Sequence, residues 1–369
     1  HTMFKNKRAT FRCGAVSFGL ALLLLVGCSE NINITEEVED TTSLARVRLL
    51  TGPQYLSALA NIFGQDIANS VVSPLPPLTR SDDGMLYSSG ASIGLTSDQL
   101  SQISITARTV AEKVVDEEHR QFLINCRPED VHAADESGAV DFLESTGRMW
   151  YRRPLEKAEL ENLVLLANSA ADQLEDFYDG LALALEGLLV SPKGFFIIDQ
   201  SEPNPNNPEE LILDPYSIAS RLSFFLWNGP PDEALLDAAE SGKLNTKEGL
   251  EEVVNRMLMS PRLENGTRAF FDDMLEFDEF NSLALDANVY PAATGSALAD
   301  AREQTLRTIY DQLIVKNGDY RDLFTVRDTF ISRNLATLYN VPASDGWQRY
   351  TFPENGPRQG GVLTHISFL

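Results

Sequence analysis

The sequence predicts a mainly α-helical protein with two or three packed helical segments and few short strands. Three observations lead to this fold class. Apolar residues recur every three or four positions over most of the chain, which is the period of a helix face. Capping residues and prolines begin these stretches, and glycine or asparagine ends them. Only GFFIID and WQRYTF have the composition typical of strands.

The first helix is predicted in LLTGPQYLSALANIFG, where Pro53 stands in the first turn and Gly64 ends the apolar pattern. Periodicity fades between about 68 and 96, where Pro, Ser and Gly predict a long loop. A second helix is predicted to start at a cap formed by Thr96 or Ser97. Apolar stripes of this kind usually face the core, so we expect both helices to pack against other elements.

Two further helices are predicted around the element RRPL. One begins just after Pro154, and LEDFYDGLALALEGLLVSP places a leucine-rich stripe on the other. The segment SEPNPNNPEE, residues 201–210, holds three prolines and three asparagines. Because these residues disfavour both helix and central strand, the segment is predicted to be a linker.

The stretch RLSFFLWNGPPDEALL predicts a helix, a corner and a second helix. Asp214 can cap the first helix with Pro215 in its first turn, and Asn228 can end it in a left-handed conformation. Asp232 can cap the next helix, and Trp227 is predicted to anchor the corner by packing. The apolar side of the first helix is predicted to consist of Ile218, Leu222, Phe225 and Leu226.

The remaining patterns complete the predicted organisation. Later helices are predicted at about 246–259, 263–277, 294–316 and 330–339. The expected divisions are 1–27 (cloning remnant and signal peptide), 28–48 (acidic tether), 49–143 (N-terminal helical segment), 144–200 (helical segment with RRPL), 201–210 (linker), 211–345 (helical domain with RLSFFLW) and 346–369 (truncated start of a further domain).

The N-terminus resembles a bacterial lipoprotein signal. His1 and Thr2 precede Met3 like a cloning remnant, and a basic region and an apolar run then lead to Cys28. The run has about 15 residues, whereas a membrane-spanning helix needs about 20. Its end, LVGC, resembles a lipobox, so Cys28 is the predicted lipid attachment site. Because Ser29 is not Asp, the sorting pattern of such lipoproteins implies the outer membrane. An ordinary signal peptide or a short anchor is the alternative.

The net charge of the chain bears on its possible partners. The formal net charge is -24 and the basic residues are scattered, which argues against a nucleic-acid partner. Calcium binding is a second interpretation of the acidity.

Acylation of Cys28 would leave Cys126 as the only thiol of the mature chain, so no internal disulfide is expected. Cys126 is interpreted as an inert buried thiol, with a reactive thiol as the alternative.

Motifs for common cofactors are missing from the sequence. There is no HExxH, CxxC or glycine-rich phosphate loop, so neither zinc nor a nucleotide is predicted. Glu117, Glu118 and His119 are adjacent, but neighbouring helical positions point in different directions and do not favour one shared metal. No cofactor is therefore expected, and no CxxCH motif for covalent haem is present.

The best catalytic candidates are carboxylates in and after FFDDMLEFDEF. Two carboxylates in one cleft are the arrangement that glycosidases use. On a helix, Asp272 and Glu276 would share a face. The alternative is an amphipathic helix with solvated acids and Phe270, Met274 and Phe277 on its apolar side. The candidate catalytic residues are Asp272, Asp273, Glu276 and Glu303, and Glu303 could instead pair with Arg302, Arg307 or Arg333.

Arg152 and Arg153, the basic pair of RRPL, are candidate ligand-binding residues. Their side chains could hold a carboxylate or a sulfated sugar by bidentate hydrogen bonds. An ion pair inside the protein is the alternative.

Several motifs together resemble those of planctomycete-type multidomain proteins, whose segments are domains of unknown function that accompany planctomycete cytochrome c. The matching stretches are LTGPQYLSALANIFG, GRMWYRRPLEKAEL, LEGLLVSPKGFF, DPYSIASRLSFFLWNGPPDEALLDAAESGKL, RNLATLYNVP and RQGGVLTHISFL. Relatives often carry a haem segment and a second cysteine before RRPL, and this sequence has neither. Its last residues resemble the opening of the next domain of the family.

These observations favour an outer-membrane lipoprotein that binds or assembles with envelope partners, in polymer utilisation or electron transfer. The membrane is contacted through the lipid on Cys28, and polysaccharide or a separate cytochrome is the expected partner. The alternative is a hydrolase that acts on the glycosidic bonds of a polysaccharide. The sequence is therefore compatible both with a binding protein and with an enzyme.

Overall fold

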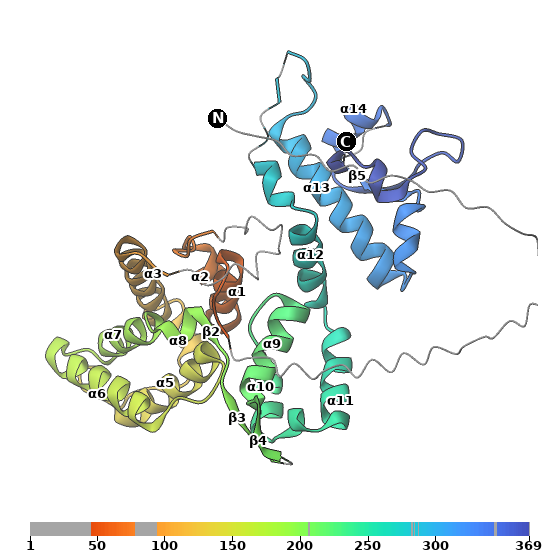
Figure 1. The fold of residues 1–369 in the computed structure, drawn as a ribbon. Coiled ribbons are helices and arrows are strands. Elements are labelled where there is room, and N and C mark those ends of the chain that lie inside the picture. The colour runs from red at the N-terminus through yellow and green to blue at the C-terminus, as the bar shows by residue number, and fades with distance from the viewer. Residues whose placement is uncertain are drawn as a thin grey trace, which may run out of the picture. The chain divides into compact units, whose positions relative to one another are not determined.

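The computed structural model describes residues 46–77, 94–205, 207–281, 283, 285–286, 288–342 and 345–368. Helices dominate these residues, and their strands form only two-stranded antiparallel sheets (Figure 1). The predicted mainly α-helical fold class is confirmed. Cys28, most of the acidic tether and much of the predicted 68–96 loop lie outside the described residues. Within the described residues, no helix has both the length and the apolar composition needed to span a bilayer.

The first half of the described chain builds one hydrophobic core from helices. Its large buried side chains include Tyr55, Trp150, Phe177 and Phe195. The elements are β1 (Val47–Leu49), α1 (Gly52–Phe63), α2 (Gln65–Asn69), α3 (Ser97–Val115), α4 (Arg120–Leu123), α5 (Glu136–Tyr151), α6 (Lys157–Leu174), α7 (Phe177–Leu189), α8 (Pro192–Phe195) and β2 (Phe196–Ile198).

Local capping signals explain where these helices begin. The Thr51 hydroxyl accepts from the backbone of Gln54, whose side chain accepts from the backbone of Thr51, and this capping box starts α1. Thr96 and Gln99 form the same motif at the start of α3. The helix after RRPL begins at Lys157, two residues later than predicted, because its cap is Glu156.

The antiparallel pair β1 and β2 brings the beginning of the described chain against residues near 200. Val47 pairs with Ile198 and Leu49 pairs with Phe196. The backbone N–H of Asp199 donates to the carbonyl of Arg46 at 2.9 Å. This pairing therefore places Arg48 of β1, and Arg46 just before it, beside the segment that follows α8.

The second half of the described chain contains three smaller hydrophobic clusters. Its elements are β3 (Ser201–Asn204), β4 (Asn207–Leu213), α9 (Pro215–Trp227), α10 (Glu233–Glu240), α11 (Lys247–Leu258), α12 (Leu263–Met274), α13 (Gly295–Tyr310), a π-helical turn (Asp311–Val315), β5 (Asp328–Ile331), α14 (Arg333–Tyr339) and β6 (Gln348–Thr351), with short 3-10 turns at Lys243–Asn245, Phe277–Asn281, Tyr320–Phe324, Gly361–Thr364 and Ile366–Phe368.

The helix, corner and helix predicted from RLSFFLWNGPPDEALL are present. Asp214 caps α9, Asn228 ends it with a φ of 49°, and Asp232 caps α10. Trp227 is buried, and its indole N–H donates to the carbonyl of Met257 at 3.0 Å. Trp227 is thus the packing anchor of this corner.

Details of the predicted apolar faces and element limits differ from the structure. Phe225 is 74% exposed, whereas its neighbour Phe224 is 6% exposed and packs into the core. The segment predicted as a helix at 330–339 begins as strand β5, which pairs with β6. Residues 201–210 form most of the hairpin β3–β4, in which Ser201 pairs with Leu213. Cross-strand pairing decides both cases, and it is not visible in the local sequence.

Candidate functional site

Two of the four proposed catalytic carboxylates, Asp272 and Glu303, pair with arginines. Asp272 on α12 pairs with Arg302 on α13, whose second nitrogen donates at 2.7 Å. Glu303 lies between Arg268 and Arg307, and the Arg307 Nε donates to it at 2.6 Å. Each of these acids is therefore compensated by at least one guanidinium group.

The predicted shared helix face of Asp272 and Glu276 is wrong. Helix α12 ends at Met274, and Glu276 follows in the left-handed region with a φ of 55°. The predicted apolar side is also different, because Phe270 is 45% exposed whereas Phe271 is buried. Asp273 has interactions of its own and is not a free carboxylate.

His119 is bound by two aspartates and not by its neighbours Glu117 and Glu118. The two ring nitrogens of His119 lie 2.7 Å from Asp116 and 2.8 Å from Asp66. The hydrogen bond to Asp116, and to a smaller extent that to Asp66, raises the pKa of His119. In the part of the chain that the structure describes, no His, Cys, Asp and Glu side chains gather in a way that could hold a metal ion.

Cys126 is half-buried and has no disulfide. Burial, followed by the nearby charge of Asp135, raises the pKa of its thiol. A thiol with a raised pKa forms less of the reactive thiolate, which fits the interpretation of an inert cysteine.

Arg152 is buried and has no carboxylate partner among the residues that the structure describes. It ends helix α5 with a φ of 61°, and only 3% of the residue is exposed. Its terminal nitrogens donate to four backbone carbonyls, those of Trp150, Lys193, Gly194 and Phe196, at 2.6–3.0 Å. Burial and the neighbouring Arg153 and Arg48 lower its pKa to about 9, so it stays protonated at neutral pH. A buried charge with no counter-charge is unusual in proteins.

Arg153 points to the other side and forms the internal ion pair. It donates to Asp214 at 2.9 Å and to the side-chain oxygen of Gln200 at 2.6 Å. Asp214 also caps α9 by accepting from the backbone of Ser217. Neither arginine of RRPL therefore offers a free bidentate fork to a ligand.

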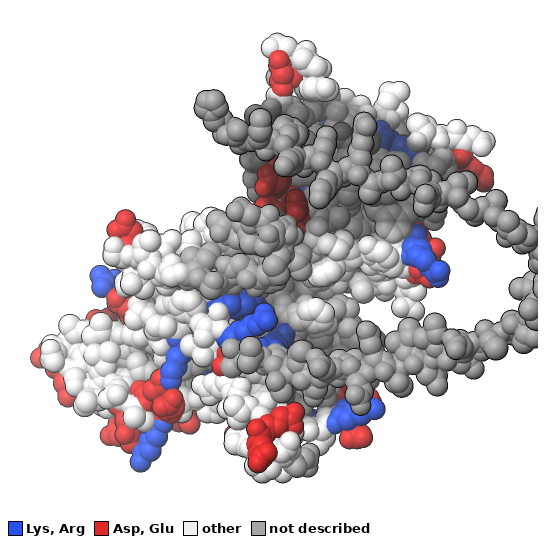
Figure 2. All heavy atoms as spheres, viewed as in Figure 1, with Lys and Arg blue, Asp and Glu red and all other residues white. Residues whose placement is uncertain are grey.

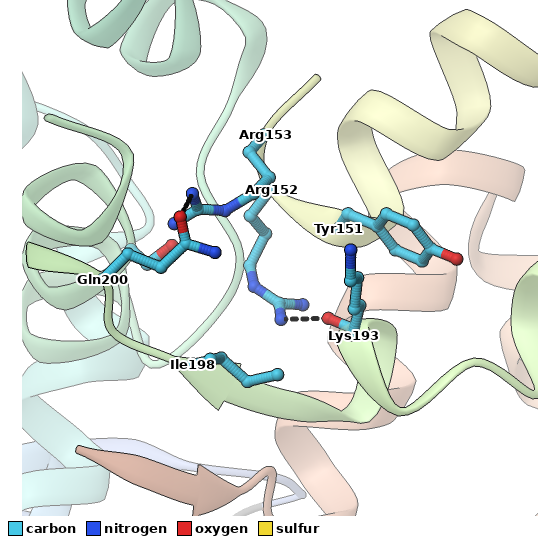
Figure 3. A pocket seen from close by; sticks show the side chains of 7 residues that line it. Tyr151, Arg152, Arg153, Lys193, Ile198 and Gln200 are labelled. Carbon is cyan, nitrogen blue, oxygen red and sulfur yellow. Dashed lines mark hydrogen bonds between the residues drawn. The ribbon is translucent and has the colours of Figure 1, made fainter. Parts of the chain in front are cut away.

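A small pocket opens beside these two arginines (Figure 3). It has a volume of about 70 Å³. Its lining contains three cationic side chains and no carboxylate: Tyr151, Arg152, Arg153, Lys193, Ile198, Gln200 and Ser220. Lys193 is held by Glu156 and Glu159, which lie outside the lining at 3.1 and 2.7 Å from its ammonium group.

Further arginines surround the pocket. Arg48 of β1 and Arg152 both lie over the ring of Phe224, at 5.4 and 5.9 Å from its centroid. Asp199 binds Arg221 at 2.6 Å. Burial lowers the pKa of Arg48, and the charge of Asp199 opposes this shift. Figure 2 shows Lys and Arg side chains gathered in the region where α1, β2 and α9 lie in Figure 1. In a strongly acidic chain, this region is locally rich in positive charge.

Arg152 and Arg153 were predicted from the sequence as binding residues, whereas the other pocket residues were not. One signal was present in helix α9, where serines recur at every third position. Ser217, Ser220 and Ser223 are all buried, which shows that this polar stripe faces the protein and not the solvent. Lys193 and Gln200 had no local signal, because α8 and β2 bring them to Arg152 only in the folded chain.

Comparison with protein families gives two partial matches. Residues 139–199 match the model described as PSD5: Protein of unknown function (DUF1595), and residues 213–341 match PSD4: Protein of unknown function (DUF1592). The chain has no significant match to a curated protein or to a solved structure. The pocket lining comes from both matched segments, with Gln200 between them. The chain thus carries segments of two domain families of unknown function, and they fit the family associated with planctomycete cytochrome c.

Proposed function

We propose that this chain is a lipoprotein of the bacterial outer membrane that binds or assembles with other envelope components. In this proposal Cys28 carries the lipid. The partner is a polysaccharide or a separate cytochrome, and the protein takes part in polymer utilisation or electron transfer. The LVGC sequence supports the anchor, and the resemblance to proteins that accompany cytochrome c supports the envelope setting.

The basic pocket is the observation that carries the binding function. A glycosidase needs two carboxyl groups that face the same space. Asp272 and Glu303 are each tied to arginine, and the pocket beside Arg152 is lined by cations and polar groups. This geometry supports recognition of an anionic group and does not support the hydrolase alternative.

Retention and turnover should be measured on the same polymers. The purified chain is mixed with neutral, uronic-acid-containing and sulfated polysaccharides and with a c-type cytochrome, and the products are analysed in parallel. We expect retention of an anionic polymer or of the cytochrome, without hydrolysis. Hydrolysis that Asp272→Asn or Glu303→Gln abolishes in a folded protein would instead establish the hydrolase alternative.

The proposed anchor is tested separately in cells that make the lipoprotein. Labelled palmitate should enter the wild-type chain, and the protein should fractionate with the outer membrane. Cys28→Ala should lose both the label and the membrane fraction, whereas Cys13→Ala should retain them. Label in the Cys28→Ala protein, or wild-type protein in another fraction, would refute the proposed attachment and location.

A further inference from the structure

We infer that the pocket lined by Tyr151, Arg152, Lys193, Gln200 and Ser220 is a binding site for one small oxyanion, a phosphate, sulfate or carboxylate group. This inference deepens the binding function proposed above, on which it rests for its biological setting. It also changes the roles of the residues, because the arginines of RRPL are not the donors that hold the ligand.

Arg152 contributes charge to the site. Its two terminal nitrogens donate four hydrogen bonds, all to backbone carbonyls, and are therefore occupied. No carboxylate of the described residues pairs with it, although the neighbouring Arg153 and Lys193 both have acidic partners. In a partly buried pocket a positive charge is weakly screened, and an anion that enters beside Arg152 would be stabilised by it.

Ser220 and Gln200 supply the hydrogen-bond donors. Ser220 is 7% exposed, lines the pocket and has no side-chain hydrogen bond with any described residue. The Gln200 oxygen accepts from Arg153, which fixes the orientation of the amide. Its nitrogen is therefore on the opposite side, toward Arg152 in Figure 3, and forms no hydrogen bond within the described part of the chain. A buried hydroxyl and an oriented amide N–H next to a cation favour a ligand with acceptor oxygens.

The size of the pocket admits a small ligand. A volume of about 70 Å³ holds several ordered water molecules, since one needs only about 10–15 Å³ of such space. A single oxyanion group therefore fits, either as a free ion or as a charged substituent of a polymer. The absence of a carboxylate from the lining disfavours a cation.

Calorimetric titration of the purified chain tests this site without any partner. Sodium phosphate, sulfate and acetate are titrated in turn, with ionic strength held constant by NaCl. We expect saturable binding of at least one ion to a single site. Gln200→Glu keeps the oxygen that Arg153 binds but replaces the donating nitrogen by a negative oxygen, so it should abolish binding. Ser220→Ala should weaken binding about tenfold, the effect of losing one hydrogen bond to a charged group.

Ser223→Ala is the matched control. Ser223 is also buried on α9, but its hydroxyl donates to the carbonyl of Ser220 and does not line the pocket. Its removal should leave ion affinity unchanged. No saturable binding of the three ions to wild type, or equal weakening by Ser220→Ala and Ser223→Ala, would overturn the site. Ion binding without retention of any polymer or cytochrome would uphold the site and refute the proposed partners.

Discussion

The N-terminal and C-terminal parts of the described chain each contain an arginine and a histidine whose partners differ in kind. In the N-terminal part, Arg152 donates to four backbone carbonyls and pairs with no acid of the described residues, while His119 lies between two carboxylates. In the C-terminal part, Arg302 pairs with an acid, while His365 is buried among hydroxyl groups. Of these two arginines and two histidines, one of each type therefore faces an acid and the other does not. The comparison teaches that residue type alone does not mark a site, since the surrounding partners decide whether charge is left over.

The largest expected effect comes from removing the uncompensated arginine. Arg152→Met leaves four buried carbonyls without their donor, and each unsatisfied acceptor costs about 1–3 kcal/mol. We expect the free energy of unfolding to fall by about 4 kcal/mol, measured by urea denaturation. Arg152→Lys should not restore it, because an ammonium group cannot reproduce the planar set of donors. A loss below about 1 kcal/mol would show that the carbonyls find other partners.

The second effect is acid destabilisation through His365. Its ring nitrogens lie 2.9 Å from the Thr305 hydroxyl and 3.3 Å from the Thr329 hydroxyl. Burial, and then the charge of Arg358, lower its pKa to about 3. The native state keeps His365 neutral, whereas the unfolded state takes up a proton below a pH of about 6.5.

The stability that His365 contributes is thus fully present above a pH of about 6.5 and is lost as the pH falls toward 3. Between pH 6 and 4, wild type should lose about 1.4 kcal/mol more per pH unit than a folded His365→Asn variant. The measurement is the pH dependence of urea unfolding for both proteins. Parallel pH profiles would mean that His365 is protonated in the native state.

A smaller effect on the free energy of unfolding is expected from the ion pair between Asp272 and Arg302. The Asp272 and Arg302 side chains are 27% and 46% exposed, so solvent weakens their attraction. Asp272→Asn or Arg302→Met should lower the free energy of unfolding by no more than about 1 kcal/mol. A double-mutant cycle in urea gives the coupling energy directly. A loss as large as that of Arg152→Met would remove the difference between the two regions.

The smallest expected effect concerns His119. Both of its ring nitrogens face carboxylates, which only accept hydrogen bonds when ionised, so the protonated ring fits this position best. Because its pKa is raised, its contribution to stability is present below a pH of about 6.5 and is lost as the pH rises through the native pKa.

An NMR titration of the His119 ring tests its hydrogen bonds to Asp116 and Asp66. The native pKa should lie above that of an unstructured histidine, and Asp66→Asn should lower it. The change in the free energy of unfolding should be smaller than that of the other variants, because Asp66 is largely exposed. An identical ring pKa in Asp66→Asn would show that Asp66 does not bind His119 in solution.

The positions of many helix ends were predictable because capping is local. The side chain of Asp214 reaches a backbone N–H three residues away, and Asn228 adopts the left-handed conformation one residue past the helix. Glu276 shows the limit of this approach. The acids and aromatics around it continue a plausible helical pattern, yet the helix ends at Met274 and the chain turns. A helix end without a strong local stop depends on what the following residues pack against.

Helical periodicity, helix caps and the lipobox-like LVGC are local patterns of neighbouring residues. They were enough to predict the fold class, the helix corner at Trp227 and a lipid anchor. Folding alone decided that Phe224 is buried while Phe225 is exposed, and that Asp272 and Glu303 are bound by arginines. It also brought Gln200 and Ser220 to Arg152. The physical reason is distance along the chain, because burial and charge compensation depend on partners that no local pattern specifies.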